Sequence, residues 1–484
     1  MKLFKPSQRW VEWGIPAAIL LLNIIYKILF LGARDITIDE PFTLFYSQMP
    51  WRDIFHMLPG ENNPPLHFLL MHAWIQLVGI EPFQARLLSL IFGACSAVLI
   101  YLIGTRSFSR TVGISAALLF TFSNFNTYIA QEARVYSLFV LLSLISVFLF
   151  LKLIKEFRSK TLILLIVTNI LLIYAHFFAF WIIFIEYLFF LSFRDIHTRL
   201  IKPFAIMAGA LVVAFLPYLT IFIERFLSSS GGTWLEPPTI SSLYNLLWKF
   251  CNQPVPTVMV ILVLLLGLGR YVFLRLKGNA IPDRPTQFLI LWFLLPTLLT
   301  FVLSFFLPVF YEKYLVFIAP AIYILACKSV EFIVHKKSVR IGILLVLITG
   351  FAVTSTPKPY YSRSVTSMVN DLKVLRNPND PIVIIPGYYD KTFLYHYDRE
   401  GFKKYLKVDE TEQNNNLLPV YDPTTIFASD LLGCNKVFLI EAGSQYMDPS
   451  GLLFRQLNAH FDSIQTVEYS EVLKLYLFQK KNKK

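Results

Sequence analysis

The chain has 484 residues, of which 56% are hydrophobic and only 15% charged, and its mean hydropathy is +0.57. Soluble domains carry about 25% charged residues, so this composition excludes an ordinary soluble globule and predicts a polytopic membrane protein. The formal net charge of +13 does not indicate nucleic-acid binding, because Lys and Arg lie mostly in short segments between apolar runs. The four Cys residues show no CxxC or Cys/His spacing, so neither a zinc site nor a disulfide framework is indicated.

Eleven apolar runs predict membrane spans, and the first, which lacks a small-residue cleavage site, is expected to be retained as a helix. The runs cover residues 12–32, 85–104, 111–128, 133–151, 161–175, 177–193, 203–222, 256–274, 286–307, 314–330 and 339–354. The segments between them alternate between rich and poor in Lys and Arg, and the rich ones face the cytoplasm. We therefore expect a multi-pass protein of the cell (inner) membrane, with a cytoplasmic N-terminus and an extracytoplasmic C-terminal part.

A further apolar stretch at residues 64–78 is short for a span and is interrupted by His67, His72 and Gln76. If it crossed the membrane, every later loop would change sides and the basic loops would face outward. We expect an interfacial helix instead. Residues 33–84 then form one large outer loop with two interfacial helices, the first near residues 40–57.

The composition changes after residue 354. Short apolar runs at 381–386, 436–441 and 473–478 are bounded by turn residues and predict buried strands, and residues near 363–376 and 448–460 are expected to be helical. The chain is therefore expected to consist of a transmembrane module at residues 1–354 and a small extracytoplasmic α/β domain at residues 355–484. No Gly-rich phosphate loop follows the first of these strands, so nucleotide binding there is unsupported.

Polar and ionisable groups gather on the predicted outer side of the membrane. Such groups are costly at membrane depth and are usually functional. They comprise Asp35, Asp39, Glu40, Asn63, His67, Arg86, Glu132, Arg134, Tyr136, His176, Lys313, Tyr314 and the segment Trp234-Leu-Glu-Pro-Pro238. Their common side predicts a cavity at the outer interface that holds carboxylates and cations together.

Most of these residues also have a structural explanation. Asp39 and Glu40 suit the N-cap and first turn of a helix, and Asp35 suits a solvated loop. The remaining alternatives are interfacial anchors for Arg86, Arg134 and Lys313, a hydrogen-bonded structural histidine for His176, and an aromatic belt for Tyr136 and Tyr314. Glu186 lies inside a span, away from this face, and has no predicted catalytic role.

Five short motifs, taken in order, resemble the GT-C superfamily of glycosyltransferases. The likeness is closest to bacterial members related to protein O-mannosyltransferases and lipid A aminoarabinose transferases. The motifs are Asp39-Glu40, Asn63-Pro-Pro-Leu66, Ala85-Arg-Leu-Leu-Ser89, Glu132-Ala-Arg-Val-Tyr136 and Trp234-Leu-Glu-Pro-Pro238. Each motif is short, and it is their order and sidedness that match. One departure is Lys313-Tyr314, where relatives often have Arg-Tyr, because Lys lacks the bidentate fork that suits phosphate.

The resemblance implies a polyprenyl-phosphate-linked sugar as donor, an inverting transfer, and a catalytic acidic residue at the position of Asp39. Asp39 would take the proton of the acceptor hydroxyl while the sugar–phosphate bond breaks. Cations would stabilise the leaving phosphate, and an apolar groove between spans would hold the polyprenyl tail. The expected substrate-binding set is Asn63, His67, Arg86, Glu132, Arg134, Tyr136, Lys313 and Tyr314, with Glu40 as a second catalytic candidate.

The acceptor is left open between a lipid, a glycan and a protein, and no nucleic-acid partner is expected. Glu40, Glu132 and His176 could orient the acceptor or hold a divalent metal ion. Some relatives use a metal ion and others do not, so the metal requirement is also left open.

Three other functions compete with this one. A transporter or flippase of lipid-linked sugars would also have many spans, but transporters place ionisable groups near the membrane midplane, where only Glu186 fits. A ligase or polymerase that acts on polysaccharide or oligosaccharide chains would keep the same fold. A receptor-like protein would use the C-terminal domain, where no convergent site is visible.

Overall fold

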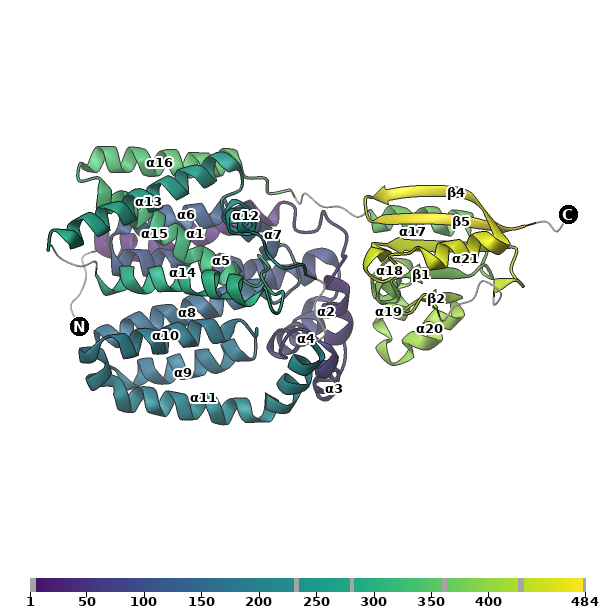
Figure 1. Ribbon diagram of the computed structural model, residues 1–484, viewed down its shortest axis with the longest axis horizontal. Helices are drawn as coiled ribbons and strands as arrows, with labels where there is room; N and C mark the ends of the chain where they lie inside the picture. Colours follow the sequence, from purple (N-terminus) through teal and green to yellow (C-terminus); the bar gives the residue numbers. More distant parts are fainter. Residues whose placement is uncertain (1–5, 230–234, 279–282, 359–363, 425–430, 482–484) are drawn as a thin grey trace. The chain divides into compact units, whose positions relative to one another are not determined.

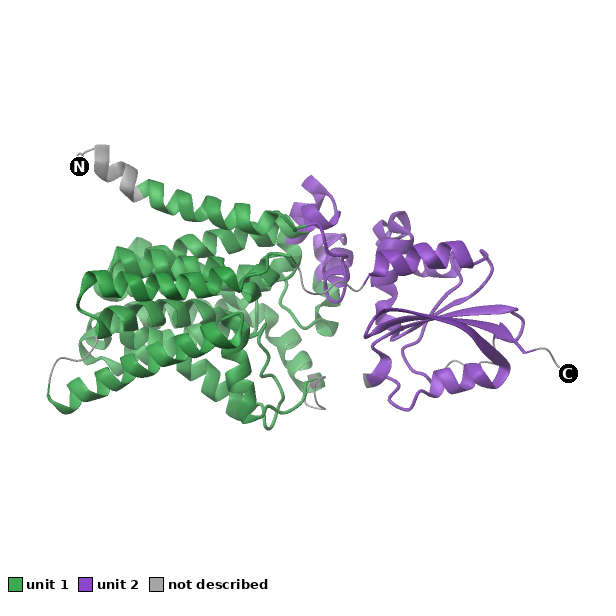
Figure 2. Cartoon of the chain, turned by 90° about the horizontal axis from the view of Figure 1, so that it is seen from above, with its two compact units in different colours: residues 1–31, 55–70, 86–358 green, residues 32–54, 71–85, 359–484 purple. Residues whose placement is uncertain are grey.

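The computed structural model describes residues 6–229, 235–278, 283–358, 364–424 and 431–481 (Figure 1). These residues form two compact units (Figure 2). Unit 1 comprises residues 1–31, 55–70 and 86–358, and unit 2 comprises residues 32–54, 71–85 and 359–484. The division falls near the expected domain boundary at residue 355, but two stretches of the predicted outer loop group with the C-terminal residues. The expected boundary itself stays a prediction.

Unit 1 is helical, and each of the eleven apolar runs contains a helix. The helices of these runs are α1 (Pro6–Ile28), α5 (Pro82–Ser107), α6 (Arg110–Thr121), α7 (Asn124–Ala130), α8 (Tyr136–Lys155), α9 (Ser159–Ile173), α10 (Ala179–Ser192), α11 (Arg194–Ser229), α13 (Pro254–Leu276), α14 (Arg284–Leu303), α15 (Ala319–Ile333) and α16 (Lys337–Val353). By length and composition, α5, α8, α11, α13, α14 and the segment 316–333 suffice to cross a membrane. The predicted polytopic helical membrane fold is thereby confirmed.

Burial separates central from peripheral helices. In α8 and in the segment 316–333, 72% of the apolar window is buried, against 17% in α11 and α13. The first two therefore form the centre of the bundle, and the last two present apolar side chains outward, as lipid-facing helices do.

The run at 111–128 is two helices rather than one. Ser123 adopts an extended backbone between α6 and α7, and its hydroxyl accepts a hydrogen bond from the N–H of Asn126. This is N-cap chemistry, which ends one helix and starts the next. An unpredicted helix, α12 (Ile240–Phe250), precedes α13.

Glycines bring α5 and α6 into close contact. A Cβ atom at Gly113 would lie 2.5 Å from the carbonyl oxygen of Tyr101 and 2.9 Å from the backbone nitrogen of Thr105. Both of these are backbone atoms of α5, which cannot rotate away. Only glycine therefore fits at this crossing.

Asn252, which lies just before α13, connects the start of that helix to three other helix ends of unit 1. It has a positive φ of 73°, and its Nδ2 atom donates to the carbonyl oxygens of Phe122 at 2.9 Å and Phe351 at 3.1 Å. Its Oδ1 atom accepts from the backbone N–H of Asn124 at 2.7 Å. The ends of α6 and α16 and the starts of α7 and α13 are therefore held at one level.

The predicted outer loop contains three helices, and the prediction for its first part was wrong. The single helix expected near residues 40–57 is α2 (Glu40–Ser47) followed by α3 (Trp51–Met57). Pro50 separates them, because proline lacks an N–H and disfavours helical backbone in the residue before it. The second expected helix is α4 (Leu66–Val78); its interfacial position stays a prediction.

The C-terminal part of unit 2 is a five-stranded mixed sheet with helices on both faces (Figure 2). The strands are β1 (Ile382–Ile385), β2 (Leu417–Pro419), β3 (Lys436–Ala442), β4 (Phe461–Ser470) and β5 (Leu473–Lys480), in the order β2-β1-β3-β5-β4. β1 pairs in parallel with β2 and β3, whereas β5 pairs antiparallel with β3 and β4. The helices are α17 (Val365–Leu375), α18 (Asp390–Tyr397), α19 (Arg399–Lys403), α20 (Val408–Asn414) and α21 (Leu452–His460).

Candidate active site

A buried ion pair lies at the centre of the predicted site residues of unit 1. The Nζ atom of Lys313 lies 2.8 Å from Oε1 and 3.1 Å from Oε2 of Glu132. Both side chains are almost fully buried, at 6% and 1% exposure. The hydroxyl of Tyr128, one turn before Glu132, also donates to Oε1 at 3.2 Å. Burial of an ion pair is costly unless the geometry and further hydrogen bonds compensate, and both are present here.

Aromatic rings surround the ammonium group of Lys313. Its Nζ atom lies 5.0 Å from the ring centroid of Tyr128 and 5.4 Å from that of Tyr136, within the range of cation–π attraction. Burial alone would lower the pKa of Lys313, but the Glu132 carboxylate together with Tyr128, Tyr136 and Tyr311 outweighs this effect and raises the pKa well above the usual range. Lys313 is therefore a permanent cation, and a phosphate ligand would have to share it with Glu132.

His67, His176 and Arg134 form a second group of predicted site residues in unit 1. His67 and His176 are 2% and 4% exposed, and burial, with a smaller contribution from the Arg134 charge, lowers the pKa of each to about 3. Both imidazoles are therefore neutral at physiological pH. The backbone N–H of Leu66 donates to the carbonyl of Tyr174 at 2.9 Å, which fastens the start of α4, with His67, to the end of α9.

Aromatic stacking fixes His176. Its ring stacks on Phe139 with centroids 4.6 Å apart and planes 10° apart. The centroid of the His176 ring also lies 6.0 Å from that of Tyr136 and 5.6 Å from that of Tyr314. The predicted residues Glu132, Lys313, Tyr136, Tyr314 and His176 are thus linked by direct contacts, although their roles stay predictions.

The remaining predicted residues of unit 1 are also buried. Arg86 is fully buried, and its Nη1 atom donates to the carbonyl of Leu31 at 3.1 Å. Asn63 is 5% exposed, and its Nδ2 atom donates to Oε1 of Glu61 at 3.4 Å. Of the predicted segment 234–238, Trp234 lies outside the described residues, and Glu236 is exposed.

Asp39 and Glu40 belong to unit 2 and differ sharply in environment. Glu40 is 1% exposed, and its Oε2 atom pairs with Nη2 of Arg34 at 3.4 Å. Asp39 is partly exposed and stands at the N-cap position of α2, yet among the described residues its side chain makes no capping hydrogen bond. The structural alternative for Asp39, a side-chain cap, is therefore not realised.

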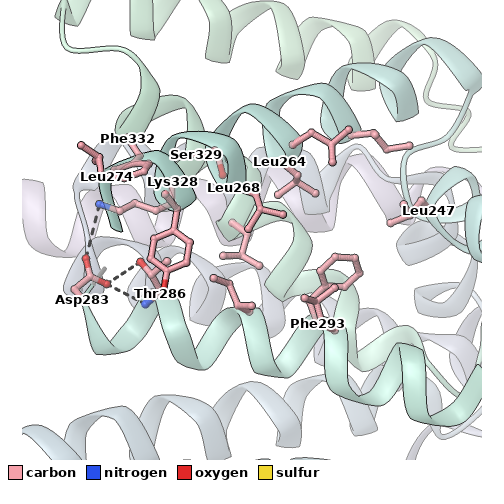
Figure 3. Close-up of a pocket in the computed structure, with 17 residues that line it drawn as sticks. Leu247, Leu264, Leu268, Leu274, Asp283, Thr286, Phe293, Lys328, Ser329 and Phe332 are labelled. Carbon is pink, nitrogen blue, oxygen red and sulfur yellow. Dashed lines mark hydrogen bonds and ion pairs between the residues drawn. The ribbon is translucent and has the colours of Figure 1, made fainter. Parts of the chain in front are cut away.

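A separate groove of about 630 Å³ lies between α13, α14 and α15 (Figure 3). Leucine and phenylalanine side chains line most of it. Asp283, Thr286 and Lys328 form a polar end, where Nζ of Lys328 lies 3.9 Å from Oδ2 of Asp283. Lys313 precedes α15, and Lys328 is the tenth of its 15 residues. A helix rises about 1.5 Å per residue, so the first two-thirds of α15 separate the polar end from Lys313. The groove is therefore distinct from the site around Lys313.

The candidate metal ligands do not come together as a conventional set. Within the described ranges, no three His, Cys, Asp or Glu side chains gather to hold a metal ion. Glu132 is bound by Lys313 and Tyr128, and His176 is stacked on Phe139. These residues do not fit a metal site.

The chain is similar to a known protein family in sequence and to solved structures in fold. Residues 62–221 match the family model described as dolichyl-phosphate-mannose-protein mannosyltransferase. The fold is similar to that of ArnT from Cupriavidus metallidurans in the apo state, with a TM-score of 0.60, 12% identity and 98% of each chain covered. The chain has the fold of the GT-C glycosyltransferases.

Other solved structures agree with this fold. ArnT from the same organism bound to undecaprenyl phosphate gives a TM-score of 0.58 at 13% identity, over 98% of each chain. The archaeal oligosaccharyltransferase AglB from Archaeoglobus fulgidus gives 0.53 at 10% identity, over 94% of this chain and 73% of that chain. No curated protein sequence matches the chain. The predicted GT-C fold and glycosyltransferase class are confirmed.

Sequence reasoning missed two partners of the predicted residues in this GT-C chain. Tyr128 precedes Glu132 by one helical turn, and this spacing could have indicated their hydrogen bond. Arg34 was overlooked among the carboxylates that follow the first run. Its charge in an otherwise acidic segment was the available signal for the pair with Glu40.

Proposed function

We propose that the chain is an inverting glycosyltransferase of the cell membrane that moves a sugar from a polyprenyl-phosphate donor to a lipid, glycan or protein acceptor on the outer side. The observation that carries the proposal is the match to the mannosyltransferase family model at residues 62–221, which include His67, Glu132, Arg134 and His176. The ArnT structure bound to undecaprenyl phosphate and the AglB structure in complex with a dolichol-phosphate support this class of donor.

In the proposed reaction, Asp39 acts as general base. Its carboxylate takes the proton of the acceptor hydroxyl while that oxygen attacks the anomeric carbon of the sugar. The bond between this carbon and the phosphate oxygen breaks, and polyprenyl phosphate leaves with the electron pair. Inversion at the anomeric carbon follows from a single displacement. Glu40, paired with Arg34, serves to orient the loop rather than to accept a proton.

The proposed donor ligand is Arg134. It is 6% exposed and lies close enough to His67 and His176 to influence both imidazoles electrostatically. Its guanidinium carries a fixed positive charge and a planar fork of N–H donors, which suits an anionic phosphate. Lys313 is paired with Glu132 and contributes less charge to phosphate binding.

The transporter alternative rests on Glu186, whose environment does not favour it. The Ser146 hydroxyl donates to Oε1 of Glu186 at 2.6 Å, and the Asn169 amide donates to Oε2 at 2.8 Å. Both carboxylate oxygens are thus occupied by neighbouring helices. A buried group satisfied in this way acts as a helix–helix contact.

The test uses the full-length protein in proteoliposomes with undecaprenyl phosphate carrying radiolabelled mannose, glucose, galactose or aminoarabinose, and a cell-envelope extract as the acceptor source. Release of undecaprenyl phosphate with transfer of label is expected for at least one donor. Asp39→Asn should reduce the rate by at least about 100-fold, the usual contribution of a general base. Asp53→Asn, a partly exposed carboxylate of α3, is the matched control. Transfer at the normal rate in Asp39→Asn would remove Asp39 as the base.

A further inference from the structure

We propose that the C-terminal residues of unit 2 position the loop that carries Asp39, with Asp35, Thr366 and His396 as positioning residues. The inference deepens the proposed function and rests on it, because Asp39 matters only if it is the base. It assigns a task to the C-terminal part, whose role the sequence did not reveal.

The first contact is a helix cap supplied from a distant part of the chain. Thr366, in the first turn of α17, donates its backbone N–H to Oδ2 of Asp35 at 2.9 Å and its hydroxyl to Oδ1 at 2.8 Å. Ser364, at the N-cap position of α17, makes no side-chain capping bond within the described residues. Asp35 therefore performs the capping, and its negative charge faces the positive end of the helix. The expectation that Asp35 is a solvated loop residue was wrong.

The second contact comes from α18. Nε2 of His396 lies 2.8 Å from the carbonyl oxygen of Ile36, and its Nδ1 lies 3.2 Å from the hydroxyl oxygen of Thr366. His396 thus joins the backbone of Ile36 to the same threonine that binds Asp35. The two residues before Thr37 are held by two helices of the C-terminal part.

The third set of contacts fixes the chain after Asp39. The ring of Phe45, on α2, packs edge-on against Phe402 with centroids 5.5 Å apart. Nζ of Lys391 lies 5.0 Å from the Phe45 ring centroid, and the Gln48 amide donates to the carbonyl of Phe402 at 3.3 Å. Asp39 is therefore flanked by anchored segments on both sides.

The residue directly before Asp39 explains why such anchoring is needed. Ile38 has a positive φ of 60°, and β-branched residues avoid this region because their side chain clashes with the backbone. A strained conformation persists only where its surroundings over-determine it, and such residues cluster at functional sites. The contacts at Asp35, Ile36 and Phe45 supply that constraint, and they thereby fix the direction in which the Asp39 side chain projects from the loop.

The geometry predicts a specific kinetic signature. If the contacts at Asp35 and Ile36 are removed, Ile38 relaxes and the Asp39 carboxylate loses its fixed position, while the donor site of unit 1 is unaltered. A misplaced catalytic group lowers kcat, and a shift of about 1 Å can cost up to about 100-fold. Donor binding, and with it KM, should hardly change.

The experiment compares full-length Asp35→Ala, Thr366→Val and His396→Phe with the conservative Thr366→Ser and with Asp371→Ala, which lies elsewhere on α17. Hydrogen exchange of residues 34–41 and the kinetics of transfer from a radiolabelled undecaprenyl-phosphate sugar are measured on each. The three disrupting variants should exchange faster over residues 36–40 and lose at least about tenfold in kcat, with KM within about twofold. Thr366→Ser and Asp371→Ala should behave like the wild type.

Three results would overturn the proposal. The first is unchanged exchange over residues 36–40 in the disrupting variants, and the second is faster exchange with a normal kcat. The third is loss of protection in β1 and β3 in all three variants, because the contacts would then serve only the stability of the domain. Exchange needs no catalysis, so if Asp39→Asn retained transfer, the proposed base would fail while the exchange data still decided whether the loop is held.

Discussion

Glu132 and Lys313 are 181 positions apart in the sequence, yet their charged atoms lie 2.8 Å apart in the interior of unit 1. The pair joins the turn before α8 to the segment before α15. These two helices, α8 and α15, are the central helices of the bundle. Removal of one charge from a buried pair leaves the other uncompensated, whereas removal of both is far less harmful.

Glu132→Gln or Lys313→Met alone should therefore destabilise the protein by about 3–5 kcal/mol, and the double variant should recover a large part of this loss. Thermal unfolding in detergent measures the effect. The exposed pair Lys403–Glu400, whose side chains are 46% and 76% exposed, is the control, and its loss should be nearly neutral. Single variants as stable as the wild type would contradict a structural role for the pair.

His176 should make stability depend on pH. Its pKa in the folded protein is lowered to about 3, whereas an unfolded histidine titrates near about 6.5. The unfolded chain therefore binds the extra proton between these values, so the contribution of His176 is full above about pH 6.5 and is lost as the pH falls toward 3.

His176→Phe keeps an aromatic ring against Phe139 but removes the titration. Melting temperatures measured from pH 8 to pH 4 should therefore fall less steeply in this variant, and the exposed His460→Gln should keep the wild-type slope. Identical slopes in His176→Phe and the wild type would show that this imidazole is not buried in its neutral form.

Arg134 should determine the affinity for polyprenyl phosphate. A hydrogen bond to a charged group contributes about 1.5–3 kcal/mol, so Arg134→Ala should weaken binding of undecaprenyl phosphate by at least about tenfold. Arg134→Lys should be intermediate, because it keeps the charge without the fork. Arg110→Ala, an exposed position at the start of α6, controls for overall charge. Equal affinities of Arg134→Ala and the wild type would remove Arg134 from the phosphate site.

The crossing of α5 and α6 should not tolerate a side chain at Gly113. Gly113→Ala places a Cβ atom 2.5 Å from the carbonyl oxygen of Tyr101, and overpacking of this kind costs about 1–3 kcal/mol. Gly342→Ala on α16, with nothing within 4 Å of the added atom, should be neutral or slightly stabilising, since Ala favours helix. Thermal unfolding separates the two, and equal stability would show that the helices can move apart.

Hydrophobic pattern was enough to predict the bundle, because each run long enough to span a membrane must form its hydrogen bonds internally. Helix boundaries were less predictable. Pro50 splits the expected helix at residues 40–57, and Ser123 divides the run at 111–128, through local backbone chemistry that periodicity does not register.

The strands show the same limit. β1, β3 and β5 are largely buried and were predicted from their apolar runs, although β5 extends to Lys480. β4 was missed, because its residues from Asp462 to Thr466 are exposed and, apart from Ile464, polar, as on a solvated edge strand. β2 has only three residues, too few for a periodic signal.

The candidate site was predictable as a set of residues but not as a set of contacts. Lys313 was expected to bind phosphate. Its ion pair with Glu132 depends on a long-range tertiary contact, which local sequence spacing does not predict. The role of Asp35 was likewise hidden, since its partner Thr366 lies 331 positions away.

Asn252 gives unit 1 a mechanical property. From its place just before α13, it bonds to Phe122 and Asn124 at the α6–α7 junction and to Phe351 near the end of α16. Asn252 is partly buried, and an intramolecular hydrogen bond contributes about 0.5–1.5 kcal/mol, so a hinge that separated α6 from α13 or α16 would have to break several such bonds together. The three bonds therefore resist separation of these helix ends, and an opening that keeps them intact would involve other segments.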